Sequence, residues 1–379
     1  MTSHKPTAIT AAVLFLAAVA LVTLVPVDFV ARAPGDAVDL LGTVAEVPVI
    51  QLGDQTTYPS TGQIVTTSVT QTPLDHPLSF AAAVIDRLLP DREVLPHDDV
   101  YQVGDTAESV AADRQAALDR TRTYAVVAAL RQLEADAPRS DAPPLVVETV
   151  AVGGIVPGGP ADGRLQTGDI LTSLGDQPIS TVAQVLVAVR QDNAVGTNLP
   201  VTVFRPGQGA VGLTIELGKS QLNLPTMGVT WTQRYDYSAY LPEVQIDLDP
   251  AGADESDGLA LALALYDRLT PDDLTGGRIV AAVGSLQLTE AGQNTTPPVD
   301  PAQIATLGTV PGIRQHVVSA TDHGAGLVLL PRGNCPDVAG LTTSARLVPV
   351  STFRQAVGYL TDLAAGGDLA ALPDCGPVS

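Results

Sequence analysis

The sequence predicts an α/β protein, of the α+β kind, with two or three domains that follow one transmembrane helix. Three observations support this fold class. The chain has 379 residues with 45% hydrophobic and 16% charged side chains, so it can bury more than one core. Residues 7–27 contain no charged side chain. After this segment, β-type patches alternate with apolar residues at the three- and four-residue spacing of helices.

The N-terminal apolar segment predicts a membrane anchor over residues 7–28. A helix of this length spans the roughly 30 Å hydrocarbon core of a bilayer at about 1.5 Å per residue. A cleaved signal peptide is the alternative, because residues 31–33 fit an A-x-A cleavage site, although Pro34 follows directly. Lys5 precedes the segment and acidic residues follow it, so we expect a single-pass protein of the cell membrane with an extracytoplasmic bulk.

The acidic composition and the two cysteines limit the partners. A net charge of -21 without a Lys/Arg cluster argues against nucleic acid and anionic lipid headgroups. Cys335 and Cys375 predict a disulfide of about 4 kcal/mol in an oxidising compartment, with two buried thiols as the alternative. Glycine-rich matches at residues 207–212 and 218–220 lack the context of nucleotide sites, and no histidines take zinc-site spacing, so we expect no cofactor, nucleotide or metal.

Residues 35–140 are predicted to form the first segment of a domain. Strand patterns occupy residues 47–50 and 64–69. A capping signal opens a helical pattern over residues 106–134. Ala, Asp and Pro then dominate residues 135–144, which predicts a linker into a new unit.

Residues 145–219 are predicted to form that unit. Residues 155–171 combine a strand, a Gly/Pro turn and a Gly-Asp-Ile step, followed by a helix at 182–190 and by hairpin strands at 201–204 and 213–217. The pattern resembles the core of bacterial PDZ domains, which are mixed β units with two helices. PDZ domains bind extended peptides, usually C-terminal ones, by adding a strand to an open sheet edge.

The candidate peptide-binding edge lies at the start of this unit, at Leu145, Val146, Val147 and Glu148. No Gly-φ-Gly-φ carboxylate loop, where φ is an apolar residue, precedes this edge. The alternative is a PDZ fold that serves only as a spacer. Unfolded or C-terminal peptide segments of other proteins are the partners that this edge predicts.

A hydroxyl at a helix start is the main candidate for chemistry. A strand pattern at residues 244–248 is followed by a turn and by a helix that starts near Ser256 and ends before Pro271. Backbone N–H groups at a helix start can stabilise an oxyanion, as acyl transfer demands. Serine is also a preferred helix N-cap, so the same residue has a purely structural explanation.

The segments around Ser256 resemble the Lon-type peptidase domain in order and spacing. The resemblance rests on residues 256–259, 266–270, 274–279, 312–315 and 329–331. Membrane-anchored, PDZ-containing Lon-like serine peptidases form the nearest group, and these chains have a Lon proteolytic domain without an ATPase module. The resemblance implies that residues 35–140 and 222–376 together form this domain, that the PDZ unit is an insertion, and that the chain forms a homo-oligomer.

The resemblance gives Ser256 the place of the nucleophile and His316 the place of the general-base lysine. The chain contains only Lys5 and Lys219, and neither can occupy that place. A histidine can act as a general base, but its imidazole is shorter and stiffer than a lysine side chain and needs an orienting partner. The three carboxylates next to Ser256 would oppose a developing oxyanion unless they point to solvent.

Two functions follow from these features. The first is an extracytoplasmic, membrane-anchored serine endopeptidase homologue in which the PDZ unit delivers peptides to Ser256 and His316 accepts its proton. The second is a catalytically inactive adaptor with a peptidase fold, which binds peptides or active relatives through its PDZ unit. The missing lysine leaves open whether the chain is an enzyme, and the sequence does not identify a substrate.

Overall fold

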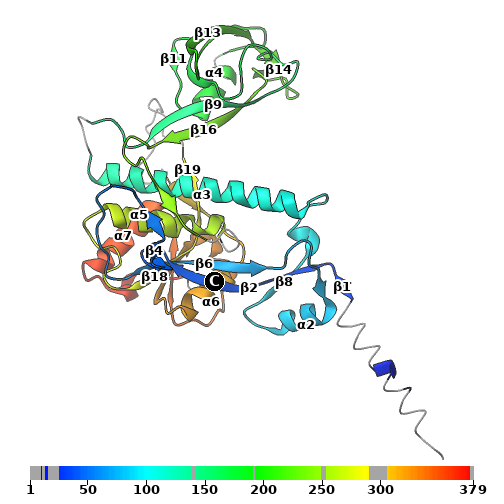
Figure 1. The fold of residues 1–379 in the computed structure, drawn as a ribbon, viewed down its shortest axis with the longest axis vertical. Helices are drawn as coiled ribbons and strands as arrows, with labels where there is room; N and C mark the ends of the chain where they lie inside the picture. Colours follow the sequence, from blue (N-terminus) through cyan, green and yellow to red (C-terminus); the bar gives the residue numbers. More distant parts are fainter. Residues whose placement is uncertain are drawn as a thin grey trace, which may run out of the picture.

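The chain forms an α/β core and a smaller β-rich unit that stands apart from it (Figure 1). The computed structural model describes residues 10, 13–15, 25–138, 142–190, 193–248, 253–289 and 305–375. The β-rich unit, residues 145–236, is called the PDZ-like unit below. It lies in the sequence between two segments that both contribute strands to the core sheet.

A mixed sheet organises the α/β core, with the strand order β22-β21-β18-β6-β2-β8. The first four strands are parallel, and β2 and β8 add antiparallel strands at one side. These strands are β2 (Phe29–Asp39), β6 (Gln63–Gln71), β8 (Glu93–Pro96), β18 (Ile279–Ala282), β21 (Leu327–Pro331) and β22 (Arg346–Val350).

Helices cover both faces of this sheet. Helices α5 (Gly258–Leu269) and α7 (Phe353–Ala364) pack on one face in one apolar cluster, and α3 (Ala107–Asp136) packs against α5. Helix α6 (Ile313–Asp322) packs on the opposite face in a separate cluster. Neighbouring residues of each strand point to opposite faces, so Ile64 joins the first cluster and Val65 the second.

Smaller elements complete the core. Helix α2 (Phe80–Leu88) follows β7, and three 3-10 helices lie at η1 (His97–Asp99), η4 (Arg332–Val338) and η5 (Leu369–Ala371). The short ladders of the core are β1 (Pro26–Val27) with β7 (Leu78–Ser79), β3 (Thr43–Val44) with β4 (Val47–Pro48), β5 (Ile50–Gln51) with β17 (Gln245–Ile246), and β19 (Ser285–Leu288) with β20 (Ala305–Gly308). A further short ladder, β14 (Gly218–Lys219) with β15 (Pro225–Thr226), belongs to the PDZ-like unit.

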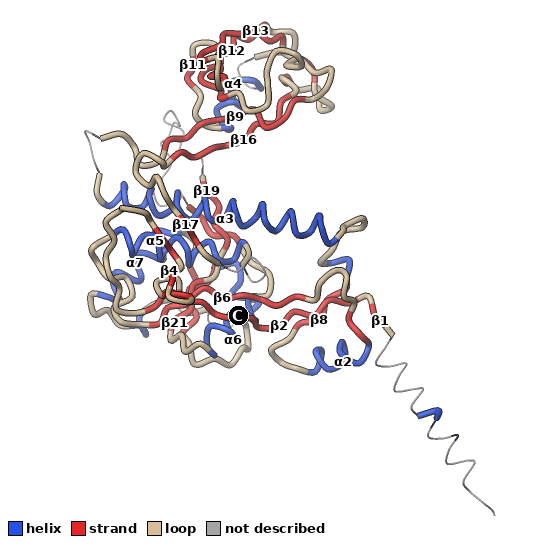
Figure 2. The backbone as a smooth tube through the Cα atoms, in the orientation of Figure 1, coloured by secondary structure: helices blue, strands red, loops and turns tan. Residues whose placement is uncertain are grey.

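The PDZ-like unit has its own strands, set apart from those of the core (Figure 2). Their order is β13-β12-β10-β9-β16, and the unit has its own apolar cluster. Its strands are β9 (Val147–Ile155), β10 (Ile170–Leu174), β11 (Gln177–Pro178), β12 (Asn198–Arg205), β13 (Gly209–Glu216) and β16 (Val229–Asp236). The unit extends past its predicted end at residue 219, because β16 pairs with β9.

Several predicted elements of both parts are confirmed. The helix predicted over residues 106–134 is α3, whose N-cap Thr106 forms a capping box with Ser109. The predicted helix at 182–190 is α4 (Val182–Arg190). Two helices were expected in the PDZ-like unit, but among its described residues α4 is the only one, and residues 160–164 form turns.

Arg131 of α3 attaches the PDZ-like unit to the core. Its Nη2 donates a hydrogen bond to Oε1 of Glu148 in β9, and both side chains are almost fully buried. The same guanidinium lies 5.5 Å from the ring centroid of Tyr235 in β16, which also meets Tyr124 of α3 edge to face. Charge pairing and aromatic contact therefore hold the unit on α3.

The predicted anchor at residues 7–28 lies mostly outside the described residues. No helix within the described ranges combines the length and the apolar character that a membrane crossing requires. The predicted end of the anchor is corrected, because Pro26 and Val27 form strand β1, which pairs with Leu78 and Ser79.

Cys335 and Cys375 form a disulfide, as the sequence predicts. The bond ties η4 to the C-terminal segment beside β22, and both cysteines pack against the apolar cluster of α6. The cross-link therefore holds η4 and the C-terminal segment together on the α6 side of the sheet.

Removal of this disulfide is expected to destabilise the core. The bond closes a loop with a sequence separation of 40, so replacing both cysteines with serine should lower the free energy of unfolding by about 4 kcal/mol in the chain-entropy model. Urea unfolding of the full chain in detergent measures the change. Reductant should lower the stability of the unsubstituted chain to that of the variant and leave the variant unchanged. Equal stability of the two proteins without reductant would contradict the expectation.

Candidate functional site

Ser256 lies in the 3-10 helix η2 (Glu255–Asp257), directly before α5. Its backbone is held on both sides: Oδ1 of Asp254 accepts its N–H at 2.7 Å, and its carbonyl oxygen accepts the N–H of Gly284 at 2.8 Å. Its side chain is buried, with the residue 3% exposed, and Oγ has no hydrogen-bond partner among the residues that the structure describes. Asp254 caps the helix start, so the capping explanation for Ser256 is wrong.

His316 lies in α6, among residues that pack on the opposite face of the sheet from α5. Its Nδ1 is 2.9 Å from Oγ1 of Thr67, and the residue is 1% exposed. Burial lowers the pKa of the imidazole, while the negative charge of Asp254 acts in the opposite direction. The lowered pKa favours a neutral ring at physiological pH.

The two predicted catalytic residues, Ser256 and His316, do not form a hydrogen bond with each other. Within the described part of the chain, Oγ of Ser256 makes no hydrogen bond, and this includes both ring nitrogens of His316. General-base activation of a serine requires that contact, directly or through one water. The orienting partner of the imidazole is Thr67, which the sequence analysis did not single out.

Asp257 is the strongly perturbed acid of this region, although the sequence identified it only as a charged neighbour of Ser256. Thr66 donates its hydroxyl to Oδ1 of Asp257, and the N–H of Asp254 donates to Oδ2 at 2.9 Å. Full burial, followed by the nearby charge of Asp254, raises the pKa of Asp257 to about 7. The hydrogen bond from Thr66 acts against this rise.

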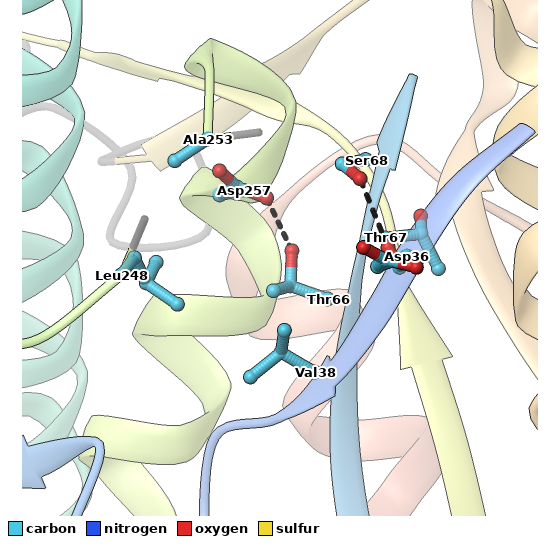
Figure 3. Close-up of a pocket in the computed structure, with 8 residues that line it drawn as sticks. All are labelled: Asp36, Val38, Thr66, Thr67, Ser68, Leu248, Ala253 and Asp257. Carbon is cyan, nitrogen blue, oxygen red and sulfur yellow. Dashed lines mark hydrogen bonds between the residues drawn. The ribbon is translucent and has the colours of Figure 1, made fainter. Parts of the chain in front are cut away.

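A small pocket of about 110 Å³ opens beside Asp257 and β6. Figure 3 shows the Asp257 carboxylate directed at the Thr66 hydroxyl of β6. Ser68 lies further along β6, and its hydroxyl donates to the carbonyl oxygen of Asp36 in the neighbouring strand β2. This volume holds a few water molecules, at about 30 Å³ each, and is smaller than the roughly 300 Å³ of a typical ligand site. Within the described ranges, no three His, Cys, Asp or Glu residues are grouped to hold a metal ion.

The predicted peptide-binding edge at Leu145, Val146, Val147 and Glu148 is corrected. Leu145 and Val146 are buried in the main apolar cluster of the core. Val147 and Glu148 lie in β9, where they pair with Asp236 and Tyr235 of β16. β16 therefore occupies one edge of this segment, and Arg131 binds the Glu148 side chain.

The sheet has two edge strands, β13 and β16, and helix α4 lies beside β16. In the described part of the chain, β16 is the last strand of the sheet and pairs only with β9. Gly228 precedes it with a φ of +68°, a left-handed conformation that favours glycine. The carbonyl oxygens of Met227 and Gly228 accept hydrogen bonds from Ala161 and Val156, so the loop is fixed on the Gly/Pro turn.

Helix α4 lies beside β16 and is tied to it. Oε1 of Gln233 accepts the N–H of Val182 at 3.1 Å, and Nε2 donates to the carbonyl oxygen of Ser180 at 3.0 Å. The edge was missed because the apolar-Gly-apolar signal, residues 227–229, follows the hairpin instead of preceding the first strand. A search for this signal at both ends of the unit would have found it.

Comparisons with known proteins give a partial likeness. No protein-family model matches the chain, and no curated protein matches it, so neither comparison supports the Lon-like resemblance. The PDZ domain of an SdrC-like protein from Listeria monocytogenes is similar, with 19% identity over 22% of this chain and 85% of that chain and a TM-score of 0.20. The PDZ domain of an SdrC-like protein from Listeria innocua has 20% identity over 22% of this chain and 92% of that chain, with a TM-score of 0.21.

The raised pKa of Asp257 predicts a pH-dependent cost to stability. The unfolded carboxyl has a pKa near 3.8 and the folded one near 7, so the folded state holds the extra proton between these values. Stability therefore falls as the pH rises through this window. Asp257→Asn should have little effect at about pH 4 and should stabilise the protein above about pH 7, on the order of a few kcal/mol.

Urea unfolding of the full chain over this pH range measures the effect. Asp98→Asn is the matched control, because the side chain of Asp98 is 88% exposed, and we expect no change from it. A difference between Asp257→Asn and the unsubstituted chain that stays constant with pH would refute the assignment.

Proposed function

We propose that the chain is a peptide-binding adaptor, in which an extended segment of another protein adds as a strand to the open edge of β16. The observation that carries this proposal is the unpaired edge of β16, with Gly228 at its start and α4 alongside. Strand addition supplies main-chain hydrogen bonds for affinity, and side-chain contacts supply selectivity. Unfolded segments and C-terminal tails are the peptides that suit such an edge.

Apolar side chains beside the edge support a preference for apolar peptides. Val229 and Trp231 are half-buried residues of β16 that pack against the cluster of the PDZ-like unit. Leu186 of α4 is 41% exposed and lies one helical turn beyond Val182, the residue that Gln233 ties to β16. The side chains of a peptide on β16 would meet Leu186.

We also propose that the α/β core is a Lon-like platform that does not hydrolyse peptides. The supporting observations are the unpartnered Oγ of Ser256, the engagement of His316 by Thr67, and the buried carboxyl of Asp257 next to Ser256. Peptide hydrolysis needs a nucleophile within reach of its base and a site for the oxyanion. A carboxylate at Asp257 would oppose a negative charge at that site.

The proposed adaptor is tethered to the cell membrane by its N-terminal segment, with the rest of the chain outside the cytoplasm. The charge-free sequence of residues 7–25 supports the tether. The disulfide between Cys335 and Cys375 supports an oxidising compartment. Active peptidases of the same type and further copies of this chain are its proposed partners besides peptides.

Peptide binding is expected to change the fluorescence of Trp231. This residue is the only tryptophan of the chain and lies on β16, so a strand added there alters its surroundings. Titration of the full chain with peptides that end in apolar residues should give a saturable change in emission. Leu186→Glu should weaken binding about tenfold or more, which is about 1.4 kcal/mol.

Val187→Glu is the matched control, because Val187 has the same 41% exposure on the same helix and a different direction around its axis. We expect it to bind like the unsubstituted chain. Emission that does not respond to any peptide, or equal losses in the two variants, would reject β16 as the binding edge.

Ser256 is expected to resist active-site labelling. A fluorophosphonate probe reacts with serines that a base activates, and Ser256 has no hydrogen bond to one. We therefore expect no label on the full chain between about pH 6 and pH 9, a range that brackets the titration of a histidine. A known serine hydrolase in the same tube is the positive control.

Ser256→Ala should also leave the Trp231 titration unchanged. Labelling that the Ser256→Ala and His316→Ala substitutions both abolish would show an active peptidase and refute the platform proposal.

A further inference from the structure

Helix α2 carries an apolar face that the core does not cover. Phe80, Val84 and Leu88 recur at four-residue steps, so they lie along one side of the helix. Leu88 is 78% exposed and Ile85 is 58% exposed. The apolar face, as the term is used here, consists of the exposed side chains Phe29, Phe80, Val84, Ile85, Leu88 and Leu89. Contiguous exposed apolar side chains of this kind mark an interaction surface.

A hollow of about 490 Å³ lies within this face. Val27 and Phe29 line it on the strand side, and Phe80, Val84 and Leu88 line it on the helix side. Its volume is in the range of sites that take small apolar molecules or acyl chains. Arg87 is the one charged residue of its lining, and a long arginine side chain can place its charge at a polar boundary.

The apolar face begins where the charge-free N-terminal sequence ends. The N–H of Phe80 donates to the carbonyl oxygen of Val25 at 3.1 Å, and β1 pairs with β7 just before α2. The first residue of α2 is therefore one hydrogen bond away from the last residue of the apolar sequence 7–25. A segment that leaves a bilayer at Val25 brings α2 to the bilayer surface.

We infer that the apolar face of α2 rests on the membrane surface, with lipid acyl chains in the hollow that Phe29, Phe80 and Leu88 line. This inference rests on the tether proposed above. Helix α2 is about 13 Å long, and interfacial helices bury their apolar side by roughly 5 to 10 Å. The contact adds a second point of attachment, which fixes the tilt of the molecule relative to the membrane.

Local charge fits a neutral lipid surface. Asp86 is the only acidic residue of α2, and it is buried and paired with Arg92 at 2.6 Å. The net charge of -21 opposes anionic headgroups, so apolar burial and zwitterionic lipid must supply the attraction. In Figure 1 the PDZ-like unit lies at the opposite end of the molecule from α2. With α2 on the membrane, the PDZ-like unit is held away from it.

Tryptophan quenching by brominated lipid tests the contact. The full chain is reconstituted into phosphatidylcholine vesicles with brominated acyl chains, in a Trp231→Phe background that removes the native fluorophore. Leu88→Trp and Ile85→Trp each place a fluorophore on the apolar face, at exposed positions that tolerate a larger side chain. We expect both to lose emission relative to unbrominated vesicles. Phe204→Trp, on the PDZ-like unit, is the matched control and should keep its emission.

Flotation of the same vesicles separates the two proposals. If the chain does not float with the vesicles, the tether fails and this inference fails with it. If it floats and Leu88→Trp and Ile85→Trp are both unquenched, the tether stands and the inference is overturned. Emission of Leu88→Trp that shifts with protein concentration in lipid-free detergent, without quenching in vesicles, would assign the face to a second copy of the chain and also overturn it.

Discussion

The alternation of side chains along β6 is the constraint on which the α/β core depends. Ile64 faces the cluster that contains α5 and α7, and Val65 faces the cluster of α6. The next two residues continue the pattern with hydroxyls, because Thr66 bonds to Asp257 and Thr67 contacts His316. One strand thus divides two apolar layers and, at its polar end, two buried ionisable groups.

This division places the two predicted catalytic residues beside different layers of the core. Ser256 belongs to the α5 layer, and His316 belongs to the α6 layer. A lysine side chain has a flexible four-carbon stem. The imidazole has one carbon between backbone and ring, and its Nδ1 already contacts Thr67. A histidine at this position therefore has less reach than a lysine would have.

The sequence predicted helices α3 and α4, which depend on interactions between residues close together in the chain. Thr106 and Ser109 gave the start of α3, and the periodic residues of 182–190 gave α4, because caps and amphipathic spacing act within a few residues. The pairing of β16 with β9 could not be predicted in this way, since it joins residues some eighty positions apart. The perturbed pKa of Asp257 was hidden for the same reason, because its burial depends on β6.

The attachment of the PDZ-like unit links the proposed peptide site to the core. Tyr235 stands at the far end of β16 from Gly228, and it packs against Arg131 and Tyr124 of α3. Arg131 is nearly buried and also pairs with Glu148, so loss of either partner would leave a buried charge that costs about 3 to 5 kcal/mol. A peptide strand on β16 would therefore extend a sheet that is already fixed on the longest helix of the described chain. Since α3 packs on α5, the orientation of β16 follows from the packing of the α/β core.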